Sequence, residues 1–107
     1  MKIGLDFDGV IVDSQQFNRL EDKPNILECH PIKGAREAIL WLQRRGHDIY
    51  ILTARPKDEW VLIEAWLKKR EFPVMRVSNK KERGTTIFLD DRAVRFTNWL
   101  DFTKLIY

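Results

Sequence analysis

Two carboxylates one residue apart end the first apolar run of the chain. Residues 3–10 read IGLDFDGV, so Asp6 and Asp8 follow a segment that is suited to burial. Like charges held close together raise the cost of ionising each other. The pair is therefore expected either in a solvated loop or beside a positive charge. An aspartate in such a place is also a competent nucleophile toward phosphorus.

Polar residues also follow two later segments with strand character. Thr53 ends the segment HDIYILT, and Asp90 and Asp91 follow the segment TIFL, with Lys80 and Lys81 in the loop before it. In an open parallel α/β sheet, the carboxyl ends of the strands form the ligand crevice. These side chains are therefore predicted at the same edge of one sheet as the N-terminal pair of aspartates.

The residue types at this edge suit a metal ion and a phosphate. A group of carboxylates repels itself unless a cation neutralises it, and oxygen ligands without His or Cys suit Mg²⁺. The Thr53 hydroxyl and a lysine ammonium would hold an anion with several oxygens, for which phosphate is the obvious candidate. A second carboxyl beside a nucleophilic aspartate can act first as an acid and then as a base. The metal ligands are expected among Asp6, Asp8, Asp90 and Asp91.

Strands alternate with helices along the chain, which is the pattern of βαβ units with a parallel sheet. Strands are predicted at 3–5, 47–53, 74–77 and 86–89, and helices at 34–46 and 56–70. The predicted fold class is α/β, with a three-layer α/β/α, Rossmann-like parallel sheet. The last stretch, 93–107, fits either a short helix or a closing strand.

Composition indicates a soluble globular domain. With 107 residues, the chain has the usual size for one hydrophobic core, so a single domain over 1–107 is expected. Its one cysteine, Cys29, cannot form an internal disulfide, and no apolar run is long enough to span a bilayer, so a cytoplasmic location is expected. The net charge of +3 and the pI of about 9.2 make nucleic acid a partner worth testing.

Taken in order, these residues resemble the motifs of the haloacid dehalogenase superfamily of phosphohydrolases. The first motif, Asp-x-Asp-x-Val/Thr after an apolar strand, matches DFDGV at 6–10, and the second, a Thr or Ser that ends the next strand, matches Thr53. The third motif is a lysine, for which the loop SNKKERG offers Lys80 and Lys81; the offset from Ser78 favours Lys81. The fourth motif, an acidic pair after a further strand, matches residues 90–91.

The resemblance implies a role for each matched residue. Asp6 would attack phosphorus, and Asp8 would protonate the leaving oxygen and later activate water. Mg²⁺ would be held by the Asp6 carboxylate, the backbone carbonyl of Asp8 and one acid of the Asp90–Asp91 pair. Thr53 and the lysine would hold the phosphoryl oxygens, and the same phosphate-binding set is expected to include Gly9 and Arg55.

The resemblance also implies a small member of the superfamily without a cap domain. The segment 14–33 is too short for a domain and is expected to form a flap over the site. A site without a cap is open, which favours a bulky substrate unless another subunit supplies the lid. The expected partner is therefore a phosphorylated small molecule, such as a nucleotide, or a phosphorylated nucleic-acid end. No membrane partner is expected.

Two other classes of protein fit part of the pattern. A receiver-type phospho-acceptor domain also places acids, a Thr and a Lys on a parallel sheet, but its phosphorylated Asp ends the third strand, where this chain has Val77 and Ser78. A noncatalytic module that binds phosphate or nucleic acid fits the pI and the basic residues near the predicted site. Binding that survives the loss of Asp6 and falls steeply with salt would indicate this class.

Overall fold

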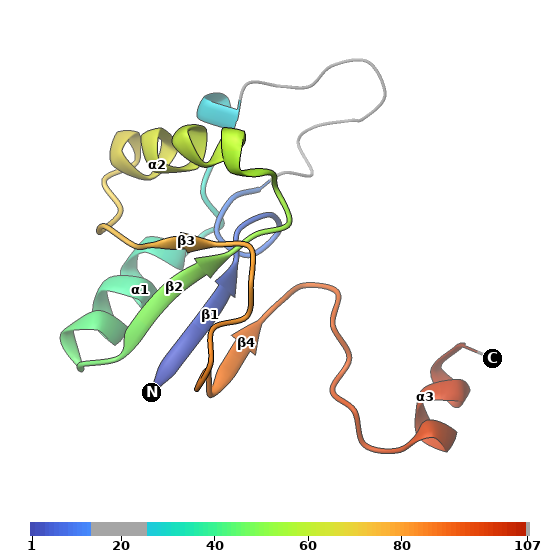
Figure 1. Ribbon diagram of the computed structural model, residues 1–107. Helices are drawn as coiled ribbons and strands as arrows, with labels where there is room; N and C mark the ends of the chain where they lie inside the picture. The colour runs from blue at the N-terminus through green and yellow to red at the C-terminus, as the bar shows by residue number, and fades with distance from the viewer. Residues whose placement is uncertain (14–25, 107) are drawn as a thin grey trace, which may run out of the picture.

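Four parallel strands form a single sheet at the centre of the molecule (Figure 1). The computed structural model describes residues 1–13 and 26–106 of the chain. The strand order is β3-β2-β1-β4. The strands are β1 (Lys2–Asp6), β2 (Asp48–Leu52), β3 (Val77–Ser78) and β4 (Ile87–Leu89). The predicted α/β class with a parallel sheet is confirmed.

Two helices, α1 (Ala35–Arg44) and α2 (Trp60–Lys69), pack on one face of this sheet. Apolar side chains of β1 and β2 share one buried cluster with Ile39 of α1 and Trp66 of α2. The chain moves across the sheet in the same direction from β1 to β2 to β3. Right-handed crossovers therefore bring both connecting helices to the same face. Both predicted helices are confirmed.

Loop 79–86, rather than a helix, lies against the opposite face of the sheet. Tyr50 of β2 points to this face, where its hydroxyl bonds to the Thr85 Oγ1 at 2.8 Å and accepts a hydrogen bond from the Glu82 backbone N–H at 3.1 Å. The ring of Tyr50 crosses over Gly4 of β1, where an added Cβ would lie 2.8 Å from the tyrosine oxygen. Among the described residues, α1 and α2 therefore cover one face of the sheet, and the segment that connects β3 to β4 is a loop on the other face.

The predicted flap at 14–33 is described only from residue 26 onward. Residues 26–28 form the 3₁₀ helix η2 (Ile26–Glu28), and Ile26 and Cys29 are buried in the core. The Cys29 carbonyl accepts a hydrogen bond from the Trp66 Nε1–H at 3.0 Å. The described part of this segment thus packs into the core against α2. Residues 14–25 lie outside the described residues.

The C-terminal stretch, for which a helix and a strand were both open, contains the helix α3 (Trp99–Ile106). Asn98 caps it, because its Oδ1 accepts a hydrogen bond from the Asp101 backbone N–H at 2.9 Å. The helix projects away from the sheet (Figure 1), and its apolar side chains, such as those of Trp99 and Leu105, are exposed. In the described part of the chain, no helix has the length and apolar character needed to cross a membrane.

Candidate active site

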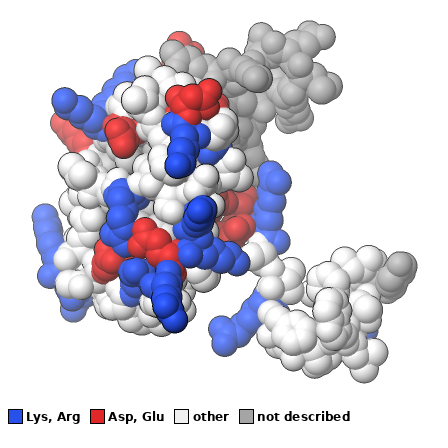
Figure 2. All heavy atoms as spheres, viewed as in Figure 1, with Lys and Arg blue, Asp and Glu red and all other residues white. Residues whose placement is uncertain are grey.

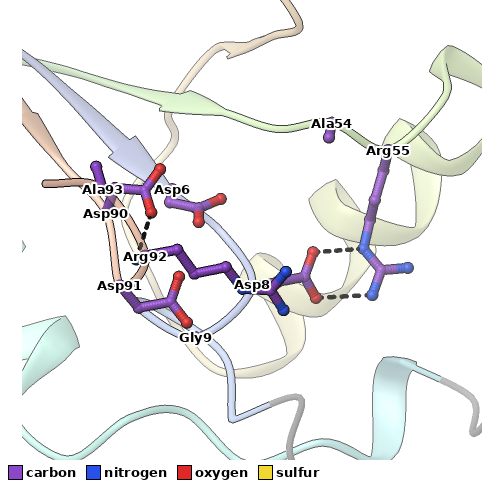
Figure 3. A pocket seen from close by; sticks show the side chains of 9 residues that line it. All are labelled: Asp6, Asp8, Gly9, Ala54, Arg55, Asp90, Asp91, Arg92 and Ala93. Atoms are coloured by element: carbon purple, nitrogen blue, oxygen red, sulfur yellow. Dashed lines mark hydrogen bonds and ion pairs between the residues drawn. The ribbon is translucent and has the colours of Figure 1, made fainter. Parts of the chain in front are cut away.

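Three carboxylates meet where β1 and β4 end side by side. Leu5 of β1 pairs with Leu89 of β4, so Asp6 lies next to Asp90 and Asp91. One oxygen from each of these three acids lies within 4.8 Å of the others. They face an open cavity of about 700 Å³ (Figure 3). The cavity is lined by Asp6, Asp8, Gly9, Ala54, Arg55, Asp90, Asp91, Arg92 and Ala93.

A tight turn after β1 places the second aspartate of the motif. The backbone N–H groups of Ile11 and Val12 both donate to the carbonyl of Phe7 at 3.0 Å, and the Phe7, Ile11 and Val12 side chains are buried. Gly9 within this turn has a φ of +84°, which favours glycine. An added Cβ at Gly9 would lie 2.7 Å from the Cγ of Asp91. The glycine therefore lets the turn approach the acidic pair closely.

The pKa of Asp6 is raised by its surroundings in the cluster. Burial raises its pKa to about 6, the negative charge of Asp90 adds to the increase, and a hydrogen bond from the Phe7 backbone N–H opposes it. The charges of Asp91 and Asp8 raise the pKa further. A cluster of carboxylates that repel one another, with oxygen as the only ligand type, fits a hard divalent cation. A bound cation would relieve the repulsion between the carboxylates; without it, a proton on Asp6 relieves part of the same repulsion.

Asp8 does not point toward the other three carboxylates. Its two oxygens accept hydrogen bonds from the Nε and one terminal nitrogen of Arg55, at 2.9 and 2.8 Å. Figure 3 shows the Asp8 carboxylate turned toward Arg55 and away from Asp6 and Asp90. Its side chain is thus outside the potential cation cluster, which leaves its backbone carbonyl as the predicted ligand. Arg55, predicted to bind phosphate, is engaged with Asp8 in this structure.

A second cavity of about 320 Å³ adjoins the first and shares Asp6, Ala54 and Asp90 with it. It is lined by the phosphate-binding candidates Thr53 and Lys81, together with Asn79 and Phe88. Thr53 is buried, and its Oγ1 accepts a hydrogen bond from the Arg55 backbone N–H at 3.1 Å. The structure thus places Thr53 and Lys81 in the lining of a cavity that also contains Asp6.

Of the two candidate lysines, only Lys81 is among the residues lining these two cavities. Its Nζ lies 5.1 Å from the centre of the Phe88 ring. The backbone of Lys80 is tied to Ser78, whose Oγ accepts a hydrogen bond from the Lys80 N–H at 3.1 Å and donates one to its carbonyl at 2.8 Å. The geometry favours Lys81, in agreement with the offset from Ser78.

Asn79 and Phe88 also line this second cavity, and neither belongs to the motifs recognised in the sequence. Asn79 precedes the lysine pair in the same loop, and Phe88 alternates in β4 onto the face that carries Gly4 and Tyr50. Extending the strand alternation to β4 would indicate Phe88, whereas Asn79 lies in a loop to which no alternation applies. Arg92 lines the first cavity, and its backbone N–H donates to the Asp90 Oδ1 at 2.8 Å, so the backbone rather than the guanidinium orients that acid.

Two curated relatives have a sequence similar to this chain, and each match covers only part of both proteins. A protein of Oceanobacillus iheyensis with the name "Putative nucleotidase" is 46% identical over 48 residues, which are 45% of this chain and 26% of that protein. A "Putative nucleotidase" of Bacillus cereus is 38% identical over 61 residues, which are 57% of this chain and 32% of that protein. The chain thus matches about a quarter to a third of the length of these relatives. No protein-family model matches the chain, and no solved structure matches it significantly.

The raised pKa of Asp6 predicts how stability changes with pH. A folded-state pKa of about 6, against 3.8 for the free group, means that the folded protein binds this proton more tightly than the unfolded chain. Stability without metal should therefore fall as the pH rises from 5 toward 7. Mg²⁺ should raise the Tm more at pH 7 than at pH 5, because the proton competes with the cation. Differential scanning calorimetry with and without EDTA measures both effects.

The Asp6→Asn variant is the control for this pH dependence. Its side-chain amide cannot take up the proton, so the contribution of Asp6 to the pH dependence of stability is removed. The other titratable groups, including the two histidines, are unchanged. Asp48 and Glu82 have pKa values lowered by hydrogen bonds from Arg76, so they affect stability at more acidic pH than this window. An equal rise in Tm with Mg²⁺ at both pH values would contradict the prediction.

Proposed function

We propose that the protein is a Mg²⁺-dependent phosphomonoester hydrolase of the haloacid dehalogenase type. The observation that carries the proposal is that Asp6 is shared by two groups of residues. It clusters with Asp90 and Asp91, which suit a cation, and it lines one cavity with Thr53 and Lys81, which suit phosphoryl oxygens. The names of the two relatives support a phosphate ester as the substrate, with a nucleotide as the first candidate.

In the first step, an oxygen of the Asp6 carboxylate attacks phosphorus, so that a new P–O bond forms as the bond to the leaving oxygen breaks. Asp8, whose carboxylate is paired with Arg55 before substrate binds, takes up a proton from solvent as the dianionic ester binds and gives it to that oxygen, which leaves as an alcohol. Thr53 and Lys81 hold the remaining phosphoryl oxygens while negative charge shifts among them. The products of this step are the free alcohol and an aspartyl-phosphate on Asp6.

In the second step, water hydrolyses the aspartyl-phosphate. Asp8, now a carboxylate, removes a proton from the water as its oxygen attacks phosphorus, and the P–O bond to Asp6 breaks. Inorganic phosphate leaves, Asp8 releases its proton to solvent, and both aspartates return to their starting protonation states. One acid–base group therefore serves both steps, which explains why a second carboxylate stands two residues from the nucleophile.

The cation would be held by the carboxylates of Asp6, Asp90 and Asp91, whose oxygens are close enough to share it. When bound, Mg²⁺ supplies positive charge that neutralises the cluster and screens the substrate phosphate from it. The need for such charge is large here, because three acids face the site on which a dianionic ester must bind. Without the cation, Lys81 is the described basic side chain that lines the cavity beside Asp6 and Thr53.

On the face seen in Figure 2, the distribution of charge favours a small substrate over an extended nucleic acid. Acidic and basic side chains are interspersed on the face shown in Figure 2, rather than gathered into one basic area. A surface of this kind does not provide the row of phosphate contacts on which tight nucleic-acid binding depends. A nucleoside monophosphate or a single phosphorylated end needs only the local groups around Asp6.

The proposal is tested by hydrolysis of p-nitrophenyl phosphate and of nucleoside monophosphates, with Mg²⁺ and with excess EDTA. Turnover should appear with Mg²⁺ and fall by about 10²-fold or more when the cation is removed, because charge neutralisation contributes several kcal/mol to phosphoryl transfer. Circular dichroism in EDTA shows whether the fold is kept. A folded protein that hydrolyses none of these esters with any divalent cation would contradict the proposed function.

A further inference from the structure

We infer that Arg55 is a positioning residue that holds Asp8 on the leaving-group side of the site and outside the cation cluster. The inference rests on the proposed function, since it assigns the control of its acid–base group. From the sequence, Arg55 was expected to bind the substrate phosphate. The contacts in the structure point to a different partner for its guanidinium.

Arg55 and Asp8 form a two-point ion pair. The Nε and one terminal nitrogen of Arg55 donate to separate oxygens of the carboxylate, at 2.9 and 2.8 Å. Such a fork fixes the direction of a carboxylate as well as its distance. Both side chains are about two-thirds buried, with exposed fractions of 27% for Arg55 and 35% for Asp8, so water competes little for these contacts.

Arg55 is itself held at three further points. Its backbone N–H donates to the Thr53 Oγ1 at 3.1 Å, and its carbonyl accepts a hydrogen bond from the Trp60 Nε1–H at 3.0 Å. A second terminal nitrogen lies 3.4 Å from a carboxylate oxygen of Glu59. The guanidinium is therefore fixed to the start of α2, and this anchoring lets it set the position of Asp8 rather than follow it.

Without Arg55, Asp8 would have a competing position. It lies two residues from Asp6 and lines the same cavity as Asp90 and Asp91, so a bound cation would attract it as a further oxygen ligand. A carboxylate that becomes a ligand of the divalent cation is drawn into the cluster and away from the leaving oxygen, so it cannot give that oxygen a proton. The ion pair seen in Figure 3 prevents this change, because it satisfies both oxygens on the side away from the cluster.

The inference predicts an effect that depends on the leaving group. An alkoxide, such as the 5′ oxygen of a nucleoside, needs a proton as it leaves, whereas p-nitrophenolate leaves without one. Loss of the residue that positions the acid should therefore slow nucleoside monophosphates strongly and p-nitrophenyl phosphate weakly. An arginine that bound the phosphate would affect both esters alike, because the phosphoryl group is the same.

The experiment measures kcat and KM of the Arg55→Ala and Arg55→Lys variants with both esters. For Arg55→Ala, kcat should fall by about 10²-fold with the nucleoside monophosphate and by less than about threefold with p-nitrophenyl phosphate. Arg55→Lys should restore kcat only in part, since an ammonium keeps the charge but not the fork. Isothermal titration of Mg²⁺ should show tighter binding to Arg55→Ala, because Asp8 becomes available as a ligand.

The matched control is Arg76→Ala. Arg76 also makes a two-point ion pair, with Asp48 at 2.7 and 2.8 Å, but at the start of β2, at the opposite end of the sheet. This variant should keep the kinetic constants of the wild type for both esters. Because Arg76 also pairs with Glu82, this variant separates the loss of an arginine and its ion pairs from the loss of the contact to Asp8.

Each other outcome overturns the inference in a recognisable way. A rise in KM with both esters and unchanged kcat would assign Arg55 to phosphate binding, and equal losses of kcat would remove the link to the leaving group. Unchanged kinetics would make the ion pair purely structural. A wild-type protein that hydrolyses neither ester would overturn the proposed function itself, and the inference with it.

Discussion

The Asp6→Asn variant is expected to lose turnover with every phosphate ester by a factor on the order of 10⁴ or more. The amide keeps the size and shape of the side chain, but it cannot attack phosphorus, and it also removes one of the three carboxylates that share the cation. Single-turnover and steady-state measurements with p-nitrophenyl phosphate and Mg²⁺ test this loss. Chromatography and circular dichroism verify that the variant is folded.

The same substitution should not destabilise the protein when no metal is present. Asp6 is partly buried among like charges, which raises its pKa to about 6, so at pH 7 its ionised form is unfavourable in the folded state. A neutral amide avoids this cost. The Tm of Asp6→Asn in EDTA at pH 7 should therefore equal or exceed that of the wild type, and its increase with Mg²⁺ should be smaller.

A matched control for this prediction is Asp58→Asn. Asp58 lies in the 3₁₀ helix η3 (Lys57–Glu59) and does not line either cavity beside Asp6. It undergoes the same chemical change and should keep its turnover and its response to Mg²⁺. Turnover by Asp6→Asn within tenfold of the wild type would assign the nucleophile to another group and would contradict the proposed mechanism.

The cluster of carboxylates follows from the sequence because it depends on one general property of parallel sheets. Acids that directly follow two strands meet when these strands are neighbours, and β1 pairs with β4 in the structure. The placement of Thr53 at the end of β2 follows in the same way, since β1 also pairs with β2. These residues lie at strand ends, where position along the chain determines position in space.

Arg55 shows where this reasoning stops. Its place after Thr53 puts it near the site, but the direction of its side chain depends on the turn at 7–12, on Glu59 and on the contact of Trp60 with its carbonyl. No local pattern encodes these three contacts together. A basic residue near a predicted phosphate site was therefore assigned to phosphate, whereas its closest partner is the second acid of the motif.

The face of the sheet opposite the helices departs from expectation for a different reason. In the described part of the chain, the connection from β3 to β4 at residues 79–86 is a loop on that face rather than a helix. Tyr50 holds that loop through its hydroxyl, which contacts Thr85 and Glu82. Alternation of side chains in β2 shows that Tyr50 points away from the core, but the partner that it meets depends on long-range contacts.

The Gly9→Ala variant is expected to lose about 10²-fold in turnover with only a modest loss of stability. Gly9 has a φ of +84°, and an added Cβ would meet the carboxylate of Asp91, with its Cγ at 2.7 Å. The backbone conformation costs about 1–2 kcal/mol for alanine. The clash is relieved when the Asp91 side chain rotates away, which moves one oxygen out of the cation cluster and weakens the site rather than the fold.

Gly46→Ala separates the cost of the backbone from the effect on Asp91. Gly46 has almost the same φ, +86°, but no atom lies within 4 Å of an added Cβ. Both variants should therefore show a similar fall in Tm, while only Gly9→Ala loses turnover and affinity for Mg²⁺. In an Asp91→Ala background, Gly9→Ala should cause little further loss, because the side chain that it displaces is already gone. Full additivity of the two losses would show that Gly9 acts on turnover by a route that does not involve Asp91.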